Sequence, residues 1–368
     1  MYSFEIARDP FVRPIWDPKV PFPTVENMPD PDIVTHVSVE RATPGGYHFL
    51  LTATVAYHNG RFFMGWANHR EREPGTNGDC IVRGKTSLDG IHWSEAETWI
   101  EAPLEGAESF NHPLIFSHGG TLYAYIASWY DERPHMHVFT FNDETEKWDI
   151  HPECRVAGFV PFCAPQRLDD GNWIMSGSHY WFDAAVLISD GDDLTKWEMI
   201  TVPKQEGFKF YFPEASIIKK PDRLILFCRS HNSATVASIS ESFDNGRTWT
   251  PFEHSNFPMT DSMPYAGTLS TGQNYLITNN LEEGRALLTI AVTDKDRGYF
   301  NRMFKIRHQK WPARRLFGGY DDGLGSHAGK PTEWSYPKAV EHGGNLYVAY
   351  SQGKEDCSMS IIPIEVLQ

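Results

Sequence analysis

Side chains that can transfer protons or bind a polar substrate recur beside the predicted strands of this chain. Glu214 follows a Phe-Pro pair, and Tyr336 directly precedes a proline. A tyrosine hydroxyl has a free pKa of about 10, so it becomes a nucleophile only when a neighbouring group accepts its proton. A carboxylate can be that group. Glu214 and Tyr336 can therefore do this chemistry if the fold brings them together.

Histidine and arginine lie at comparable positions and add two further kinds of chemistry. Histidine titrates near neutral pH and can act as a general acid or base, and arginine binds carboxylates through paired N–H donors. We expect His112 and His231 to transfer protons. The residues that we expect to bind the substrate are His69, Arg70, His179, Arg229, Tyr265, Asn280 and Lys354.

Six β-hairpins are predicted to position these residues. Gly-containing or Pro-Asp turns separate β-rich runs at residues 58–60, 117–120, 169–171, 219–222, 271–273 and 342–344. Such turns are direct hairpin signals, and a further β-rich run follows each hairpin. The recurrence, about every 50–60 residues over most of the chain, indicates a repeated sheet of four strands.

An Asp-box motif supports this repeat. Residues 242–249 read SFDNGRTW, which fits S-x-D-x-G-x-T-W, and residues 87–93 read SLDGIHW, a copy one residue shorter. Looser copies lie at residues 142–148 and 189–197. The Asp can accept backbone N–H groups inside the turn, the Gly supplies a positive φ, and the Trp covers the sheet core. The motif marks a fold and carries no chemistry of its own.

We therefore predict an all-β, six-bladed β-propeller that spans residues 1–368 as a single domain, with seven blades as the alternative. The last repeat lacks its outermost strand, so the N-terminal segment at residues 33–39 should complete it. This closure would pair sheet edges that otherwise invite aggregation. Residues 300–333 are expected to form an insertion loop near the pocket.

The propeller topology predicts that the candidate residues meet at one mouth. The starts of the innermost strands and the ends of the second strands lie on one face, and the Asp-box turns lie on the other. Trp93 and Trp249 should therefore lie on the face opposite His112 and Tyr336. A ring of polar and aromatic groups around a mouth is what a sugar pocket requires, so we expect an oligosaccharide or glycan substrate.

Composition limits the other partners. The net charge of −15 disfavours nucleic acid and anionic membranes, and no apolar run approaches the roughly 18 residues of a membrane span.

The five cysteines are odd in number and far apart, which indicates reduced thiols in a cytoplasmic protein, or a secreted protein whose signal peptide has been removed. His135 and His137 lack an evident third ligand, so no metal and no other cofactor is expected.

The chain resembles the sialidase superfamily of six-bladed propellers over most of residues 48–365. Three parts of the sequence carry the resemblance: the segment from Asn68 to Arg83 before the short Asp-box, the pair FPEAS (212–216) and LFCR (226–229), and WSY (334–336). The resemblance implies a general acid at Asp79, an activating carboxylate at Glu214, a nucleophile at Tyr336, and two arginines of a carboxylate-binding triad at Arg229 and Arg285.

Two features depart from that family. Its first triad arginine lies in a Y/F-R-I-P segment at the start of the first blade, where residues 48–52 read HFLLT and contain no arginine. Arg13, in FVRPI, is similar in context but lies far upstream. The histidines at 69, 112, 179 and 231 are also foreign to the family pattern.

Three functions follow from these residues. The first is an exo-acting glycoside hydrolase that cleaves a terminal, acidic or neutral sugar with Tyr336 and Glu214, and with Asp79 or a pocket histidine as the proton donor. The second is a polysaccharide lyase acting on a uronic acid. His112, His179 or His231 would remove the C5 proton, Tyr265 or Tyr336 would protonate the leaving oxygen, and Arg229 would neutralise the carboxylate. The third is a non-catalytic glycan-binding propeller, which needs no Glu–Tyr pair.

Overall fold

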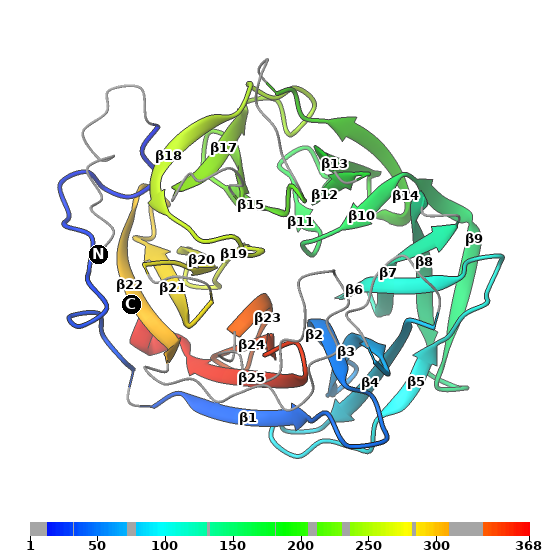
Figure 1. The fold of residues 1–368 in the computed structure, drawn as a ribbon. Coiled ribbons are helices and arrows are strands. Elements are labelled where there is room, and N and C mark those ends of the chain that lie inside the picture. Colours follow the sequence, from blue (N-terminus) through cyan, green and yellow to red (C-terminus); the bar gives the residue numbers. More distant parts are fainter. Residues whose placement is uncertain are drawn as a thin grey trace.

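The chain forms a ring of six antiparallel β-sheets around a central axis (Figure 1). The computed structural model describes residues 13–31, 33–71, 79–130, 133–180, 182–204, 212–229, 236–281, 285–308 and 334–368. The prediction of a six-bladed β-propeller is confirmed, and the seven-bladed alternative is excluded.

We number the sheets as blades one to six in chain order, and give their strands from the innermost outward. Blade one contains β2 (Phe49–His58), β3 (Arg61–His69), β4 (Ile81–Ser87) and β5 (Glu97–Ile100), and blade two contains β6 (Ser109–His118), β7 (Thr121–Tyr130), β8 (Arg133–Asn142) and β9 (Lys147–Ala157). In blade three, β10 (Phe159–Pro161) and β11 (Gln166–Arg167) both pair with β12 (Trp173–His179), which is followed by β13 (Asp183–Asp190) and β14 (Asp193–Thr201).

The second half of the ring repeats this order. Blade four contains β15 (Ala215–Lys219), β16 (Leu224–Cys228), β17 (Val236–Ser242) and β18 (Glu253–Pro258), and blade five contains β19 (Tyr265–Thr268), β20 (Asn274–Asn279), β21 (Leu287–Thr293) and β22 (Phe300–His308). Blade six contains β23 (Trp334–His342), β24 (Asn345–Gln352), β25 (Asp356–Pro363) and, outermost, β1 (Thr35–Glu40). A short 3-10 helix, Ile364–Leu367, follows β25.

The N-terminal strand closes the ring. β1 pairs antiparallel with β25, with Thr35 opposite Ile361 and Val37 opposite Met359. In Figure 1 this blue strand lies directly outside the red β25. Blade six is thus built from both ends of the chain, and all six sheets have an outer strand.

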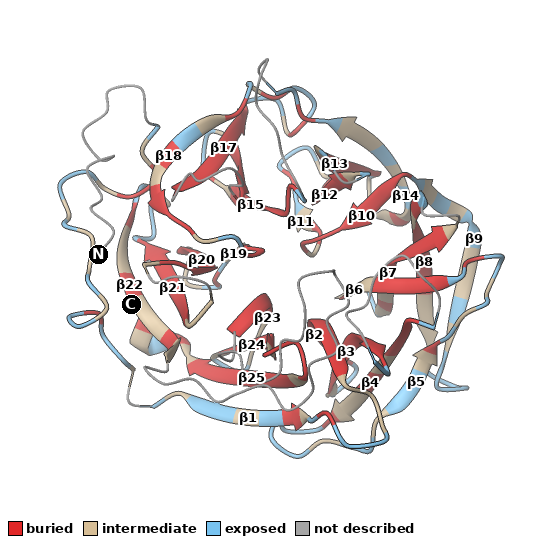
Figure 2. Cartoon of the chain, in the orientation of Figure 1, coloured by how far each residue is buried: buried red, intermediate tan, exposed pale blue. Residues whose placement is uncertain are grey.

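Apolar side chains fill the interfaces between neighbouring blades. Trp66, Phe62 and Met359 belong to the cluster between blades one and six, and Phe63 and Phe110 belong to the cluster between blades one and two. Full burial of such a side chain contributes about 1.5–3 kcal/mol. Figure 2 shows the consequence: inner strands are buried, whereas outer strands such as β1, β5 and β9 are partly exposed.

Residues 13–31 run along the outside of blades four and five. Trp16 is buried there, against Phe22 and Phe257, with ring centroids 4.3 and 6.2 Å away. Arg13 forms ion pairs with Glu241 and Glu253 at 2.9 and 2.5 Å. Arg13 is therefore engaged on the outer side of blade four.

The Asp-box turns have the hydrogen bonds that their sequences predict. Asp244 Oδ1 accepts the backbone N–H groups of Arg247 and Thr248 at 3.1 and 2.9 Å, and Asp89 accepts those of Ile91 and His92, both at 2.8 Å. The shorter box thus preserves the same turn.

Both box tryptophans close the turn that precedes them. The indole N–H of Trp249 donates to Gly246 O at 2.8 Å, and that of Trp93 donates to Gly90 O at 3.2 Å. Gly90 lies against Tyr347, near the β23–β24 hairpin turn and at the other end of β23 from Tyr336. The predicted placement of these tryptophans opposite the mouth is confirmed.

One expectation about the insertion is wrong. Residues 300–308 are not its first part, because they form β22, the outer strand of blade five. Residues 309–333, the remainder of the expected insertion, lie outside the described residues.

Candidate active site

Three neighbouring innermost strands carry the same irregularity close to their starts. β23, β2 and β6 are interrupted by bulges that contain Tyr336, Thr52 and His112, with φ angles of 58°, 54° and 47°. A left-handed conformation is uncommon for residues other than glycine, and bulges often re-aim side chains next to active sites. The bulges therefore mark the starts of blades six, one and two as the constrained part of the mouth.

The bulges bring Tyr336 and His112 together across the axis. Their ring centroids lie 6.4 Å apart in an edge-to-face arrangement, although blade one separates their blades. His112 also contacts Phe162, with a centroid distance of 5.7 Å. The structure thus joins a candidate nucleophile to a candidate general base from blades that the sequence separates by more than 200 residues.

A buried ion-pair network lies beside Tyr336. Arg229, just after β16, pairs through Nη1 with Glu214 Oε2 and through Nε with Asp261 Oδ1. The side chains of Glu214 and Arg229 are only 4% and 6% exposed. Burial acts to lower the pKa of Arg229, but the negative groups of Glu214, Tyr336 and Asp261 outweigh it, so the pKa is raised above its ordinary value. Arg229 stays charged and is the shared neighbour of Glu214 and Tyr336.

A second arginine covers the ring of Tyr336. The Arg285 guanidinium lies 5.1 Å from the centroid of that ring, within cation–π range. Its Nε and NH2 donate to the backbone carbonyl of Asp261 at 3.2 and 2.9 Å. Tyr336 itself is buried. Asp261 therefore binds both arginines, one through its carboxylate and one through its carbonyl.

The sequence did not identify Asp261. It lies in the loop between β18 and β19, two residues before Met263. An acidic residue just before an innermost strand was the only available signal, and it resembles an ordinary solvated loop aspartate.

Other predicted residues lie at strand ends on the same face. His69 is buried and accepts the N–H of Glu71 at its Nδ1, and His179 lies beside Tyr180 with a centroid distance of 4.6 Å. Lys354 is buried at the β24–β25 turn, where its carbonyl accepts the N–H of Leu50.

Two predicted residues lie on exposed parts of blade one. Arg70 is exposed, and its guanidinium lies 4.6 Å from the ring of Tyr47. Asp79 is exposed with a left-handed φ of 71°, and it forms no hydrogen bond or ion pair with another described residue. His231 lies outside the described residues.

Two predicted substrate-binding residues lie away from the mouth. Tyr265 begins β19 in regular register with Ile277, and its hydroxyl donates to Ala339 O at 3.2 Å inside the axis. Asn280 is buried in blade five and donates to Thr278 Oγ1 and Thr289 Oγ1 at 3.1 and 2.9 Å. In this structure both side chains are thus engaged in bonds within the protein.

Positive side chains gather at this mouth in a chain whose net charge is −15. Arg229, Arg285 and Lys354 lie there, and Glu214 and Asp261 are the acidic partners in the ion-pair network. Glu355, next to Lys354, is also buried, so these charges nearly balance, and the guanidiniums beside Tyr336 are the groups that could bind an anion.

The described residues offer no group of three metal-binding side chains, and none of their helices is long and apolar enough to cross a membrane. Arg229 and Arg285 can hold an anionic group close to the Tyr336 hydroxyl, and His112 is a second proton-transfer group.

Comparisons with known proteins agree with this architecture. The family of BNR repeat-like domains matches residues 60–348. A search of the curated proteins finds no match. Among solved structures, the chain is similar to a protein of unknown function from Dyadobacter fermentans DSM 18053, with 18% identity, a TM-score of 0.64, and coverage of 90% of this chain and 99% of the other.

Two sialidases are also similar in fold. The Hadza microbial sialidase Hz136 is 13% identical, with a TM-score of 0.65 and coverage of 91% of this chain and 69% of the other. The Trypanosoma rangeli sialidase, solved in complex with sialic acid, is 13% identical, with a TM-score of 0.58 and coverage of 92% and 60%. At such low sequence identity, the structural similarity shows that the folds are alike and nothing more.

Proposed function

Because the chain belongs to the family of BNR repeat-like domains, we propose that it is an exo-acting glycoside hydrolase that removes a terminal acidic sugar from a glycan. One observation carries the proposal. Tyr336 is held in a left-handed bulge, with Arg285 over its ring and Arg229 beside it, and Arg229 is paired with Glu214. A sialidase-like propeller supports a glycan as the partner.

In the proposed reaction, the Tyr336 oxygen attacks the anomeric carbon and its proton passes to Glu214. Asp79 donates a proton to the leaving oxygen as the glycosidic bond breaks, and water then releases the sugar from the tyrosine. Arg229 pairs with Glu214 in the free protein. A substrate carboxylate that takes over part of Arg229's hydrogen bonding would free a Glu214 oxygen to accept this proton, so substrate binding itself would prepare the proton transfer.

The substrate carboxylate would be held by two arginines rather than three. Among the described residues, Arg229 and Arg285 are the guanidiniums beside Tyr336, and no arginine occurs in residues 48–52. Arg13 does not substitute for the third, because Glu241 and Glu253 hold it on the outside of blade four. Two arginines therefore favour a substrate with a single carboxylate, which makes fewer charged contacts than it would with three arginines.

A lyase is the second candidate, and the contact between His112 and Tyr336 favours it. His112 would remove the C5 proton of a uronic acid, and Tyr336 would protonate the leaving oxygen. Arg285 is better suited than Arg229 to neutralise the carboxylate, because Glu214 and Asp261 already pair with Arg229. The product would contain a new double bond, whereas a hydrolase product would not.

A screen of oligosaccharides with terminal sialic, uronic or neutral sugars tests the proposal. We expect a released saturated sugar, and Tyr336→Phe should lower kcat by at least about a hundredfold with little change in melting temperature. The matched control is Tyr265→Phe, because Tyr265 lies in the axis and its hydroxyl bonds Ala339 O. That variant should retain its kcat.

The other outcomes separate the alternatives. An unsaturated product that absorbs in the near ultraviolet would establish the lyase, and His112→Ala should then abolish turnover. Glycan binding without any product would establish a binding protein. A fully active Tyr336→Phe variant would remove the tyrosine mechanism.

The thiols support a location for this activity. All five cysteines are free, and four of them are buried. Unpaired thiols are typical of a reducing compartment, so we place the protein in the cytoplasm.

A further inference from the structure

A cavity of about 250 Å³ lies on the propeller axis, on the hairpin-turn side of the bulges. We call it the axial cavity. It is lined by the later parts of the innermost strands, including residues 54–57 of β2, 114–117 of β6, 265–268 of β19 and 338–341 of β23. Tyr336, Glu214 and Arg229 are not among its lining residues, so it is distinct from the mouth.

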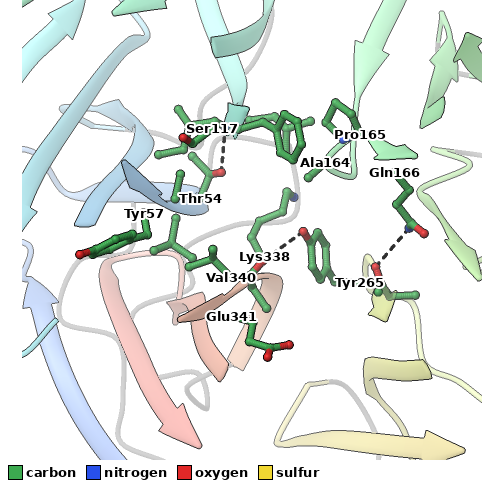
Figure 3. Close-up of a pocket in the computed structure, with 18 of the residues that line it drawn as sticks. Thr54, Tyr57, Ser117, Ala164, Pro165, Gln166, Tyr265, Lys338, Val340 and Glu341 are labelled. Carbon is green, nitrogen blue, oxygen red and sulfur yellow. Dashed lines mark hydrogen bonds between the residues drawn. The ribbon is translucent and has the colours of Figure 1, made fainter. Parts of the chain in front are cut away.

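A lysine provides the cation of the axial cavity. Lys338 lies two residues beyond Tyr336 on β23 and is only 3% exposed. Figure 3 shows its amine directed into the space between Thr54, Ala164 and Tyr265. Among the described residues its hydrogen-bond acceptor is the thioether of Met263, at 3.6 Å. An ammonium has three donors and a thioether is a weak acceptor, so most of its hydrogen-bonding capacity is unused.

The neighbouring polar groups are already engaged with the protein. Thr54 Oγ1 accepts the N–H of Ile115 at 3.1 Å, and the Gln166 amide donates to Ile217 O at 2.8 Å. The Tyr265 hydroxyl donates to Ala339 O. At the rim, Glu341 accepts the N–H of Ser270 at 2.8 Å. Figure 3 shows two of these bonds, those of Thr54 and Tyr265.

Ser117 and Thr268, which also line the cavity, are bonded to His58 and Asn274, both at 2.9 Å, and much of the remaining wall is apolar. The apolar part is formed by Val55, Leu114, Ala164, Tyr275 and Val340. The cavity thus combines one cation with hydrocarbon and aromatic surface, and it offers few spare hydrogen-bonding groups.

We infer that the axial cavity is a second binding site that takes a small monocarboxylate with an apolar body, held by Lys338. A buried charge without a partner is costly, and a carboxylate would supply the missing partner. The apolar body of the ligand would pack against the apolar walls of the cavity. A phosphate needs several donors around its oxygens, and a sugar needs partners for its hydroxyls, so neither suits this lining.

The ionisation of Lys338 supports this inference. Burial lowers the pKa of Lys338 to about 8, an effect that the acidic groups of Cys163 and Glu214 oppose. Burial raises the pKa of the Cys163 thiol and of the Tyr265 hydroxyl, so both stay neutral near pH 7. The amine is therefore mostly charged at neutral pH and loses its charge above about pH 8. Carboxylate binding should weaken over the same range.

Calorimetric titration of the full chain with hexanoate tests the inference. We expect saturable binding at about pH 6.5 that weakens at least about tenfold at about pH 9.5, because the lysine is then neutral. Hexanamide has the same body without the charge, and inorganic phosphate has charge without the body. Both should bind at least about tenfold more weakly than hexanoate. Equal binding of hexanamide, preferred binding of phosphate, or no binding of hexanoate at millimolar concentration would overturn the inference.

Lys338→Met isolates the cation, because it removes the charge and keeps the length of the side chain. It should weaken hexanoate binding at least about tenfold. The matched control is Lys220→Met. Lys220 is also buried, and burial likewise lowers its pKa to about 8, but its amine donates to Gly298 O outside the axis. Unchanged hexanoate affinity in Lys338→Met would refute the site. If that variant does not fold, the comparison of hexanoate with hexanamide in the unmodified chain decides.

Discussion

Replacing Asp244 with alanine should lower the free energy of unfolding by about 1–2 kcal/mol at neutral pH. The carboxylate accepts four hydrogen bonds in the turn between β17 and β18: from Ser242 Oγ (2.9 Å), Arg247 N (3.1 Å), Thr248 N (2.9 Å) and Thr248 Oγ1 (2.6 Å). Because the turn is exposed, water can replace much of this bonding in the variant. The expected loss is therefore well below the sum of four full hydrogen bonds.

The loss should depend on pH. Slight burial acts to raise the pKa of Asp244, but hydrogen bonds from Thr248, Ser242 and Arg247 outweigh it, so the folded-state pKa is lowered. A group whose folded pKa is lowered stabilises the protein fully above its unfolded pKa of about 3.9 and loses that contribution as the pH falls through the folded pKa. The difference between the two proteins should therefore shrink in acid.

Urea unfolding at neutral and acidic pH measures this difference, and turnover per folded molecule should be unchanged at neutral pH. The control is Asp222→Ala, whose exposed carboxylate pairs with the adjacent Arg223 at 2.9 Å and should contribute little. An equal loss of stability at both pH values would show that the carboxylate hydrogen bonds are not its cause. A turnover defect at full folding would contradict the structural role of the Asp-box.

Two further substitutions probe the ion-pair network and a turn glycine. Glu214→Gln should destabilise the fold by about 2–3 kcal/mol and lower kcat, because Asp261 is then the one charged partner that the described residues leave to the buried Arg229; unchanged urea unfolding would argue against the pair. Gly246→Ala should cost about 1–3 kcal/mol, because Gly246 has a φ of +83° and a methyl group there would lie 2.5 Å from Ile174 Cδ1. Gly171→Ala, with a φ of +92° and open space around it, should cost less in the same assay, and an equal loss in both variants would exclude the Ile174 contact as the cause.

Local signals made the propeller predictable. Hairpin turns and Asp-boxes depend on a few adjacent residues, so they are readable without knowledge of the tertiary structure. β22 was missed for a physical reason. Its buried residues, Phe300, Met303 and Ile306, recur every third position because two register shifts interrupt its pairing with β21. The two-residue period that identifies a strand is therefore hidden.

The candidate site was predictable where strand starts determine side-chain position. Tyr336, Arg229 and His112 lie near one another as the topology required. The left-handed bulges were not predictable, because Tyr336, His112 and Thr52 are not glycines. The bonds of Tyr265 and Asn280 inside the protein were not predictable either, since a shift of one position reverses the face of the strand to which a side chain points.

The closure of blade six determines when during synthesis this blade can be completed. β1 lies at residues 35–40, whereas its partner β25 lies at residues 356–363, so a ribosome makes the outermost strand first and the strand that receives it last. β1 must wait unpaired while five blades are completed. Four of its six residues (THVSVE) are polar, and three are exposed even in the finished ring. An unpaired strand of this composition has little tendency to pair with another chain. The nascent protein is therefore protected from aggregation until β25 has been synthesised.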